Sequence, residues 1–309
     1  MSSSSVPVPP LLVLLDFDGT ITQEDTINAL AEEVIAHEGT VSLSEWDGIV
    51  KAWLDEYEAH IGVYRPPAAE RSTAEAELEF LESLRGVEER SLGRVERAGV
   101  FDFGGVGRGG VLRGFGRGAL ERGVVKVREG VGEFLRGVME MGGGGDGEVE
   151  VGVVSVNWSG EWMRGVLEGV GIEGVVEGDR SLVNWIGKDG RVMGPEGVGG
   201  RVLVTAGDKR EAARSVVRGW EGEKKLGGGE KGRWIYVGDS VTDLGCLLDA
   251  TVGVVLAESE ESKVVRTLRR VGKEVSHVGG WREMALPALV WARDFREILE
   301  SGLLELGAE

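Results

Sequence analysis

The stretch LLVLLDFDGT, residues 11–20, decides the fold of this chain of 309 residues. Its first five residues are apolar, and a short apolar run of this kind is typical of a strand that is buried on both faces. Two carboxylates, Asp16 and Asp18, follow directly; Gly19 then allows a tight turn, and Thr20 supplies a hydroxyl. Because open α/β folds bind ligands beyond the carboxyl ends of their strands, the stretch predicts a parallel sheet with a site at this strand end.

The spacing of Asp16 and Asp18 has two interpretations. Two carboxylates this close repel each other unless a cation lies between them, so the pair indicates a hard divalent metal with oxygen ligands. An isolated Asp-x-Asp-Gly sequence also occurs as a plain strand followed by an Asp-Gly turn. The remainder of the chain has to decide between a metal site and a turn.

The composition is that of a globular protein that binds neither nucleic acid nor an anionic membrane. Hydrophobic residues make up 41% of the chain and charged residues 28%, which is ordinary for a globular domain. The formal net charge of −18 argues against nucleic acid and anionic membranes as partners, because either would require a basic face. A small phosphorylated metabolite remains a possible partner, since it needs only a local positive pocket.

The expected location is the cytoplasm. Cys246 is the only cysteine, so no intramolecular disulfide forms and a reducing compartment fits. The chain contains neither a signal-peptide pattern nor an uninterrupted apolar stretch of about 18 residues. The first ten residues, MSSSSVPVPP, predict a disordered tail.

Residues 22–125 predict a helical insertion. Three segments carry apolar residues at helical spacing, and a weaker fourth follows them: 25–38, 43–61, 68–84 and 104–122. The second of these segments carries an aromatic stripe of Trp46, Trp53 and Tyr57. We interpret the stripe as a packed helical core, with a surface facing a substrate as the alternative.

Glycine is unusually frequent, with 52 residues in the chain and crowded stretches at 104–118, 142–147 and 227–229. A glycine inside a helix costs about 1 kcal/mol relative to alanine, so helices in these regions should be weak. We interpret the excess as compositional drift together with loops. The Gly-x-Gly-x-x-Gly match at 105–110 lacks the flanking elements of a nucleotide-binding turn and is interpreted as chance.

Two further strand ends and one helix start carry polar side chains. The apolar strand 151–156 ends in the sequence SVNWS, residues 155–159. Ser155 and Asn157 at a helix N-terminus would form an anion site, or Ser159 or Asn157 would simply cap the helix. Lys209 lies at the start of a later helix. It would either bind an anion there or be an ordinary surface lysine, and the second interpretation is favoured. The strand 234–237 is followed by Asp239 and Asp243, which would both lie at the mouth of the same sheet edge.

The remaining elements are predicted from short patterns. Residues 173–180 predict a strand, 182–194 a β-hairpin, 251–256 a last strand, and 281–304 one or two closing helices.

Four motifs stand in order along the chain: DFDGT from Asp16, SVN from Ser155, Lys209, and GDSVTD from residue 238. With this order and spacing, the chain resembles the haloacid dehalogenase-like (HAD) phosphohydrolases. The insertion resembles the helical cap of the phosphoserine phosphatase-like branch, and the motifs are similar to those of fungal HAD-like phosphatases. The resemblance covers about residues 11–256.

This resemblance implies a fold and a division into domains. The fold would be α/β, a Rossmann-like parallel sheet with a helical cap inserted after the first strand. The core domain would comprise residues 11–21 and 126–309, the C1-type cap would comprise 22–125, and residues 1–10 would be the tail.

The resemblance also implies roles for the acids. Asp16 would be the nucleophile that forms an aspartyl-phosphate, and Asp18 would be the general acid and base, with its backbone carbonyl on the metal. Mg²⁺ would be held by Asp16, Asp18, Asp239 and Asp243. The phosphate-binding residues would be Ser155, Asn157, Lys209 and Thr20.

The implied function is an Mg²⁺-dependent phosphatase that hydrolyses a small phosphomonoester. An acid at position 18 distinguishes the chain from the haloacid dehalogenases and from the transport ATPases of this family, and it also allows a phosphotransferase or phosphomutase. A third alternative is a catalytically idle binding module. Val156 and Asn157 stand where phosphoserine phosphatases have two glycines, which argues against phosphoserine as the substrate. Arg65, Arg71 and Arg85 are candidates by charge alone for reading the leaving group, although a solvated surface is the favoured interpretation for each.

Overall fold

The centre of the molecule is a seven-stranded parallel sheet with the order β3-β2-β1-β6-β7-β9-β8. The computed structural model describes residues 10–39, 41–103, 108–142, 149–224 and 232–305. The strands are β1 (Leu11–Leu15), β2 (Val149–Ser155), β3 (Leu182–Val183), β6 (Arg233–Gly238), β7 (Val252–Leu256), β8 (Ser276–His277) and β9 (Ala288–Ala292). The predicted α/β fold with a parallel sheet is confirmed.

The register of the central strands brings their ends together. Leu15, the last residue of β1, lies opposite Val153 of β2 and Val237 of β6. Because all three strands are parallel, the residues that follow these positions emerge side by side at one edge. This register places Asp16 between the ends of β2 and β6.

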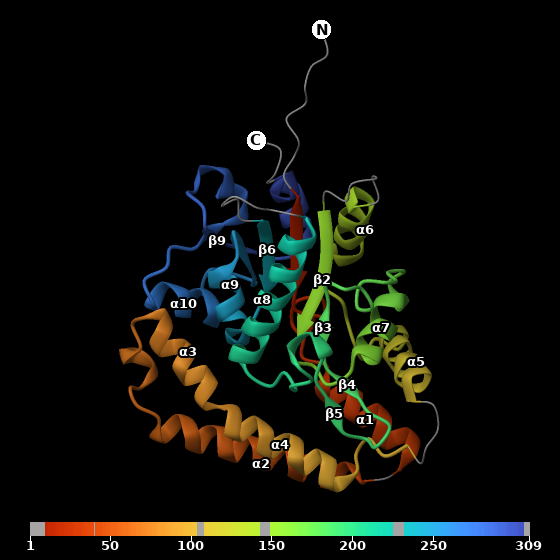
Figure 1. Ribbon diagram of the computed structural model, residues 1–309. Helices are drawn as coiled ribbons and strands as arrows, with labels where there is room; N and C mark the ends of the chain where they lie inside the picture. Colours follow the sequence, from red (N-terminus) through yellow and green to blue (C-terminus); the bar gives the residue numbers. More distant parts are fainter. Residues whose placement is uncertain (1–9, 40, 104–107, 143–148, 225–231, 306–309) are drawn as a thin grey trace.

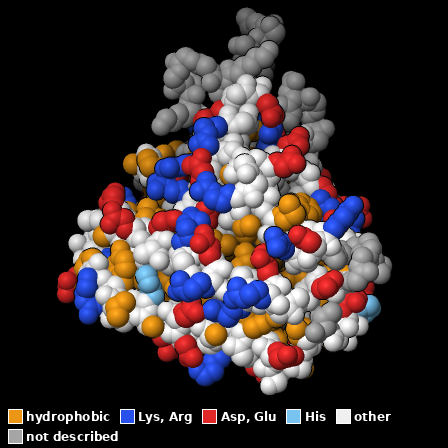
Figure 2. Space-filling model, turned by 60° about the horizontal axis from the view of Figure 1, so that its bottom comes forward, with side chains coloured by type: hydrophobic (Ala, Val, Ile, Leu, Met, Phe, Trp, Pro, Cys, Tyr) orange, Lys and Arg blue, Asp and Glu red, His pale blue; other side chains and the backbone are white. Residues whose placement is uncertain are grey.

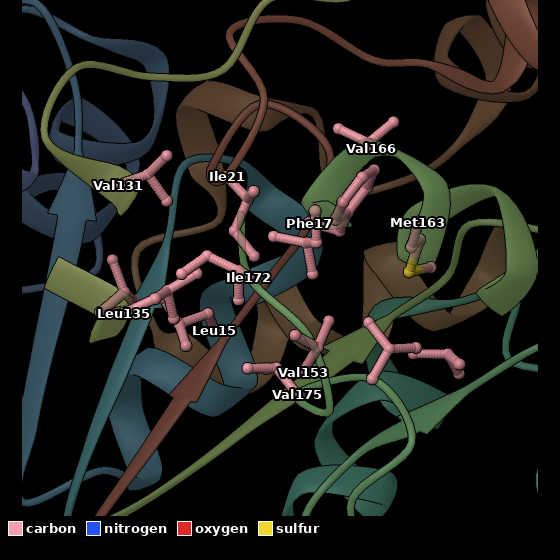
Figure 3. Close-up of a cluster of buried hydrophobic side chains, with 14 of the residues drawn as sticks. Leu15, Phe17, Ile21, Val131, Leu135, Val153, Met163, Val166, Ile172 and Val175 are labelled. Carbon is pink, nitrogen blue, oxygen red and sulfur yellow. The ribbon is translucent and has the colours of Figure 1, made fainter. Parts of the chain in front are cut away.

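Helices cover both faces of the sheet. Leu12 and Leu14 of β1 belong to one buried cluster, which α8 (Ala206–Glu223), α9 (Leu244–Asp249) and α10 (Lys263–Arg270) complete. The alternate residues of β1 belong to a second cluster with α6 (Val131–Gly142), α7 (Gly160–Gly169) and α11 (Phe295–Glu300). Figure 1 shows α8 in front of the sheet, and Figure 3 shows part of the second cluster around Leu15, Phe17 and Val153.

The described part of residues 22–125 is helical. Its helices are α1 (Ile27–Glu38), α2 (Leu43–Val63), α3 (Ala74–Ser83), α4 (Arg85–Ala98) and α5 (Arg108–Glu121). In Figure 1, α2 and α4 run side by side below the end of the sheet at which β1 and β2 terminate. The third predicted helix begins later than expected, because Thr73 caps it by accepting a hydrogen bond from Ala76 N. The domain boundaries remain a prediction, and nearly all of the predicted tail lies outside the described residues.

The glycines of α5 and α7 have a packing role that the composition did not reveal. A Cβ atom at Gly116 would lie 2.2 Å from the carbonyl oxygen of Trp162, and one at Gly165 would lie 2.0 Å from that of Arg113. The two helix backbones therefore touch, which only glycine permits. At these positions the interpretation as drift was wrong. Of the Gly-x-Gly-x-x-Gly match, residues 105–107 lie outside the described residues.

Three predictions near the edges of the sheet need correction. Residues 173–180 form turns, and the edge strand β3 follows them. The segment 251–256 is a strand but not the last one, because β8 and β9 follow it. The apolar run that forms β9 was predicted as helix, since five apolar residues have no period that separates the two structures. The predicted hairpin is present as β4 (Trp185–Ile186) and β5 (Val192–Met193).

No helix among the described residues has both the length and the apolar character needed to cross a membrane.

Candidate active site

Asp16 lies directly after β1 and is only 3% exposed. Its Oδ2 is 2.7 Å from the Nζ atom of Lys209, and its Oδ1 accepts a hydrogen bond of 2.6 Å from Phe17 N. Burial raises the pKa of Asp16 above its ordinary value, while the attraction of Lys209 opposes this rise. The ammonium group therefore favours the ionised form of the carboxylate.

Lys209 is completely buried, although a surface position was the favoured interpretation of the sequence. Its Nζ also lies 2.7 Å from Asp243 Oδ1, so two carboxylates hold one ammonium group. Burial lowers its pKa, but the attraction of Asp16 and Asp243 more than offsets this, and the pKa is raised overall. The capping box of Thr205 and Asp208 fixes the start of α8, which carries the lysine inward.

Asp239 and Asp243 complete the cluster at the end of β6. Thr20 donates a 2.9 Å hydrogen bond to Asp239 Oδ1, and Tyr236 donates one of 2.7 Å to Asp243 Oδ1. Burial and the nearby charge of Asp243 raise the pKa of Asp239 to about 6. Gly19, with φ of +72°, makes this arrangement possible because a Cβ atom there would lie 2.3 Å from Asp239 Oδ2.

One carboxylate oxygen from each of Asp16, Asp239 and Asp243 lies within 4.8 Å of the others. A set of carboxylate oxygens is the donor type that hard divalent cations prefer. Their mutual repulsion, which raises the pKa of both Asp16 and Asp239, would be relieved by such an ion. The residues present therefore fit a divalent metal.

Asp18 is oriented by three hydrogen-bond donors. Its Oδ1 accepts hydrogen bonds from Thr26 N at 2.9 Å and from the Thr26 hydroxyl at 2.7 Å, and its Oδ2 accepts one of 2.7 Å from Asn157 Nδ2. Burial raises the pKa of Asp18 to about 7, the charge of Asp25 adds to the rise, and these hydrogen bonds oppose it. A carboxyl group with this pKa can both donate and accept a proton near neutral pH.

The other predicted phosphate-binding side chains lie at the same strand ends. Ser155 is completely buried, and its hydroxyl accepts a 3.2 Å hydrogen bond from Asn157 N. The Asn157 amide contacts Asp18, and the Thr20 hydroxyl contacts Asp239. All three are thus within the site, and their binding of phosphate remains a prediction. Of the two predicted capping residues, Ser159 caps α7 by accepting a hydrogen bond from Trp162 N.

Three residues of the site were not predicted. Thr26 orients Asp18, Tyr236 holds Asp243, and Arg128 donates hydrogen bonds to the carbonyl oxygens of Gly19 and Thr20. Thr26 could have been found, because it is a hydroxyl residue close after the DFDGT motif. Tyr236 lies in an otherwise apolar strand, and nothing in the sequence around Arg128 relates it to the first strand.

A cavity of about 440 Å³ lies beside this cluster, between the core and helices α2 and α4. Its wall includes Asp25 and Asn28, at the start of the insertion, and Trp46 and Trp53 from the aromatic stripe. Trp46 is also part of the buried core, so both interpretations of the stripe hold for this residue. Trp53 faces the cavity, as the alternative interpretation expected.

The three candidate arginines do not line this cavity. Arg71 is buried and pairs with Glu77 at 2.7 Å, so the expectation of a solvated surface was wrong for this residue. Arg85 pairs with Asp208 at 2.8 Å. Arg65 is exposed and donates to the carbonyl oxygen of Tyr64 at 2.8 Å.

Comparisons with known proteins find distant likenesses. No family model matches the chain. A CTO1 family protein of Schizosaccharomyces pombe is 26% identical over 267 residues, which span 81% of this chain and 83% of the relative.

Among solved structures, a phosphoserine phosphatase in its apo form has a TM-score of 0.46 and 16% identity, over 94% of this chain and 98% of the other. A phosphoserine phosphohydrolase-like protein from Francisella tularensis has a TM-score of 0.43 and 13% identity, over 93% and 97% of the two chains. A protein of unknown function from Bordetella pertussis has a TM-score of 0.45 and 17% identity, over 85% and 95%. Because these likenesses are distant, the functional conclusion rests on the geometry of the site.

Proposed function

We propose that this protein is an Mg²⁺-dependent phosphatase that hydrolyses a small phosphomonoester through an aspartyl-phosphate on Asp16. The observation that carries the proposal is the difference in environment between the two acids of the first motif. Asp16 lies 2.7 Å from the Lys209 ammonium, whereas Asp18 is held by three donors and has its pKa raised to about 7. One carboxyl is suited to attack, and the other is suited to proton transfer.

In the first step, a carboxylate oxygen of Asp16 forms a bond to phosphorus while the bond from phosphorus to the leaving oxygen breaks. Asp18 gives its proton to that oxygen, which leaves as an alcohol. In the second step, Asp18 takes a proton from a water molecule that attacks the phosphorus, and Asp16 is released with inorganic phosphate. Lys209 neutralises negative charge on the phosphoryl oxygens in both steps.

The metal in this proposal is Mg²⁺, held by Asp16, Asp239, Asp243 and the backbone carbonyl of Asp18. When bound, it would offset the repulsion between the acids and the incoming phosphate. Thr20 holds Asp239 and Tyr236 holds Asp243 in place for this purpose. Ser155 and Asn157 would contribute to phosphate binding at the end of β2.

The proposed partner is a small phosphorylated metabolite, with neither nucleic acid nor membrane involved, and the proposed location is the cytoplasm. The net charge of −18 and the single, buried Cys246 support both statements. The attraction for a phosphate group would come locally from Lys209.

The two alternatives from the sequence differ in their support. A phosphotransferase would use the same residues and pass the phosphoryl group to an alcohol, which product analysis with an added acceptor would reveal. An idle binding module is disfavoured by the buried cluster of one lysine and three acids. Burying such charges without a function costs several kcal/mol.

The test is the release of phosphate from a chromogenic aryl phosphate by the wild-type protein and by Asp16→Asn, each in Mg²⁺ and in EDTA. We expect turnover only for the wild type in Mg²⁺. A matched control is Asp189→Asn, an exposed acid of the β4–β5 hairpin, which should retain activity. Equal turnover by Asp16→Asn would contradict the mechanism.

A further inference from the structure

The cavity beside the acids is placed to receive the leaving group of a phosphate bound at Asp16. Val156 forms part of its wall and directly precedes Asn157, whose amide donates to Asp18. Asp25, also in the wall, lies close enough to raise the pKa of Asp18. Both links place the cavity next to Asp18, so a leaving group that Asp18 protonates would extend into it.

The wall of the cavity is apolar and aromatic. Ten of its fourteen described lining side chains are apolar, and three of these are the indoles of Trp46, Trp53 and Trp158. The ring N–H groups of the first two are already bonded: Trp46 Nε1 donates to Asn28 Oδ1 at 2.7 Å, and Trp53 Nε1 donates to the Glu88 carboxylate at 3.2 Å. These rings therefore present apolar surface to an occupant.

The charge of the wall is negative. Asp25 and Glu88 are its ionisable residues, and no lysine, arginine or histidine is found among the lining residues that the structure describes. Arg85, one turn before Glu88 on α4, is bonded to Asp208 and Glu82 instead. In Figure 2, Lys and Arg side chains lie beside Asp and Glu side chains on the outer surface. A carboxylate or second phosphate on the leaving group would find no counter-charge in the cavity.

We propose that this cavity selects a phosphomonoester whose leaving group is apolar, of aromatic size, and without a second anionic group. The inference rests on the proposed function, because it assumes that the phosphate binds at Asp16. A volume of about 440 Å³ lies within the range of small-molecule sites, which are mostly apolar with a few polar groups. Phosphorylated amino acids and bisphosphates are the compounds that it rejects.

The test is calorimetric binding of two phosphonates to the wild-type protein in Mg²⁺. In each, a methylene replaces the bridging oxygen, so neither is hydrolysed. 3-Phenylpropylphosphonate corresponds to 2-phenylethyl phosphate, and 2-amino-4-phosphonobutyrate corresponds to phosphoserine. We expect the phenyl compound to bind at least tenfold more tightly, or about 1.4 kcal/mol by the usual conversion.

Two variants locate the preference in the cavity. Trp53→Ala should weaken binding of the phenyl compound at least fivefold, whereas Leu54→Ala, at an adjacent exposed position of α2, should leave it unchanged. Val50→Arg adds a positive charge to the wall and should shift the ratio of the two affinities toward the amino acid analogue.

The outcomes separate the inference from the function on which it rests. Equal affinity for both phosphonates, or tighter binding of the amino acid analogue, overturns the inference even if the protein hydrolyses phosphate esters. Selective binding of the phenyl compound that is lost in Trp53→Ala supports the inference. If such binding persists without phosphate release from any ester, only the proposed hydrolysis fails.

Discussion

The strand-end cluster and the adjoining cavity differ in almost every physical property, although they meet at Val156 and Asn157. The cluster lies at the ends of β1 and β6 and at the start of α8, and each carboxylate there has a hydrogen-bond or ion-pair partner. The cavity lies partly under α2 and α4 of the insertion, and its wall is mostly apolar. The wall contains two acidic side chains, and no lysine, arginine or histidine is among its described lining residues. Under the proposed function, the contrast assigns the chemistry to the core and gives the insertion a part in the choice of leaving group. Substitutions in the cluster should therefore reduce phosphate release without changing the ligand preference of the cavity, and substitutions in the cavity should change that preference.

The largest effect should come from Asp239→Asn, which alters the cluster alone. Losing one of three carboxylates weakens the proposed metal site, so we expect phosphate release to fall by more than about 100-fold. Phosphonate binding in the cavity should retain its preference for the phenyl compound. Steady-state kinetics over a range of Mg²⁺ concentrations checks this, and full activity at low Mg²⁺ would argue against the metal assignment.

Asp18→Asn should show an effect that depends on the leaving group. An alkyl alcohol must be protonated as it leaves, so turnover of 2-phenylethyl phosphate should fall by about 10²- to 10⁴-fold. The first step with 4-nitrophenyl phosphate should change much less, because nitrophenolate leaves without a proton. Burst kinetics with the two esters measures the difference. An equal loss of the first step with both would assign Asp18 a role other than proton transfer.

The sequence predicted the cluster far better than the cavity. Asp16, Asp18, Asp239 and Asp243 could be placed because all four lie shortly after a short apolar run, and parallel strands bring such ends to one edge. The cavity depends on how α2 and α4 lie over the core, which the spacing of Trp46 and Trp53 alone does not determine.

Side chains that contact the site from distant positions in the sequence could not be predicted, for a related reason. Tyr236 and Arg128 act through contacts with Asp243 and with the backbone after β1, and no local pattern marks them. The glycines of α5 and α7 were misinterpreted because their close approach is visible only when both helices are in place. The strand β9 was missed because a short apolar run fits helix and strand equally.

The packing of α5 on α7 offers a smaller test that leaves both sites intact. Gly116→Ala places a methyl group against the backbone of α7 and should destabilise the protein by about 1–3 kcal/mol. Gly114→Ala lies in the same helix with nothing within 4 Å of the new Cβ, and should be neutral or stabilising by up to about 1 kcal/mol. Urea unfolding of both variants measures the difference. Equal stabilities would mean that the helices can separate without penalty.

The stability of the metal-free protein should also depend on pH. Burial raises the pKa values of Asp18 and Asp239 from an ordinary 3.8 to about 7 and about 6. The folded state then holds more protons than the unfolded state. The stability that these two groups contribute is therefore fully present below about pH 4 and is lost as the pH rises through about 6 and 7.

Thermal unfolding in EDTA should therefore show a falling Tm between about pH 5 and about pH 8. Asp18→Asn should flatten part of this dependence, whereas Asp189→Asn, an exposed acid, should leave it as it is. A Tm that rises over this interval would contradict the cause given for the two pKa values.

The most direct test of the account is to find the phosphoryl group on Asp16. Asp18→Asn protein is mixed with 4-nitrophenyl phosphate and Mg²⁺, quenched in acid within the burst, and examined by peptide mass spectrometry. The account predicts one added phosphoryl group on the peptide that contains Asp16, and none in a protein that also carries Asp16→Asn. A burst of nitrophenolate with the phosphoryl group on another residue, or with no phosphorylated peptide, would contradict it.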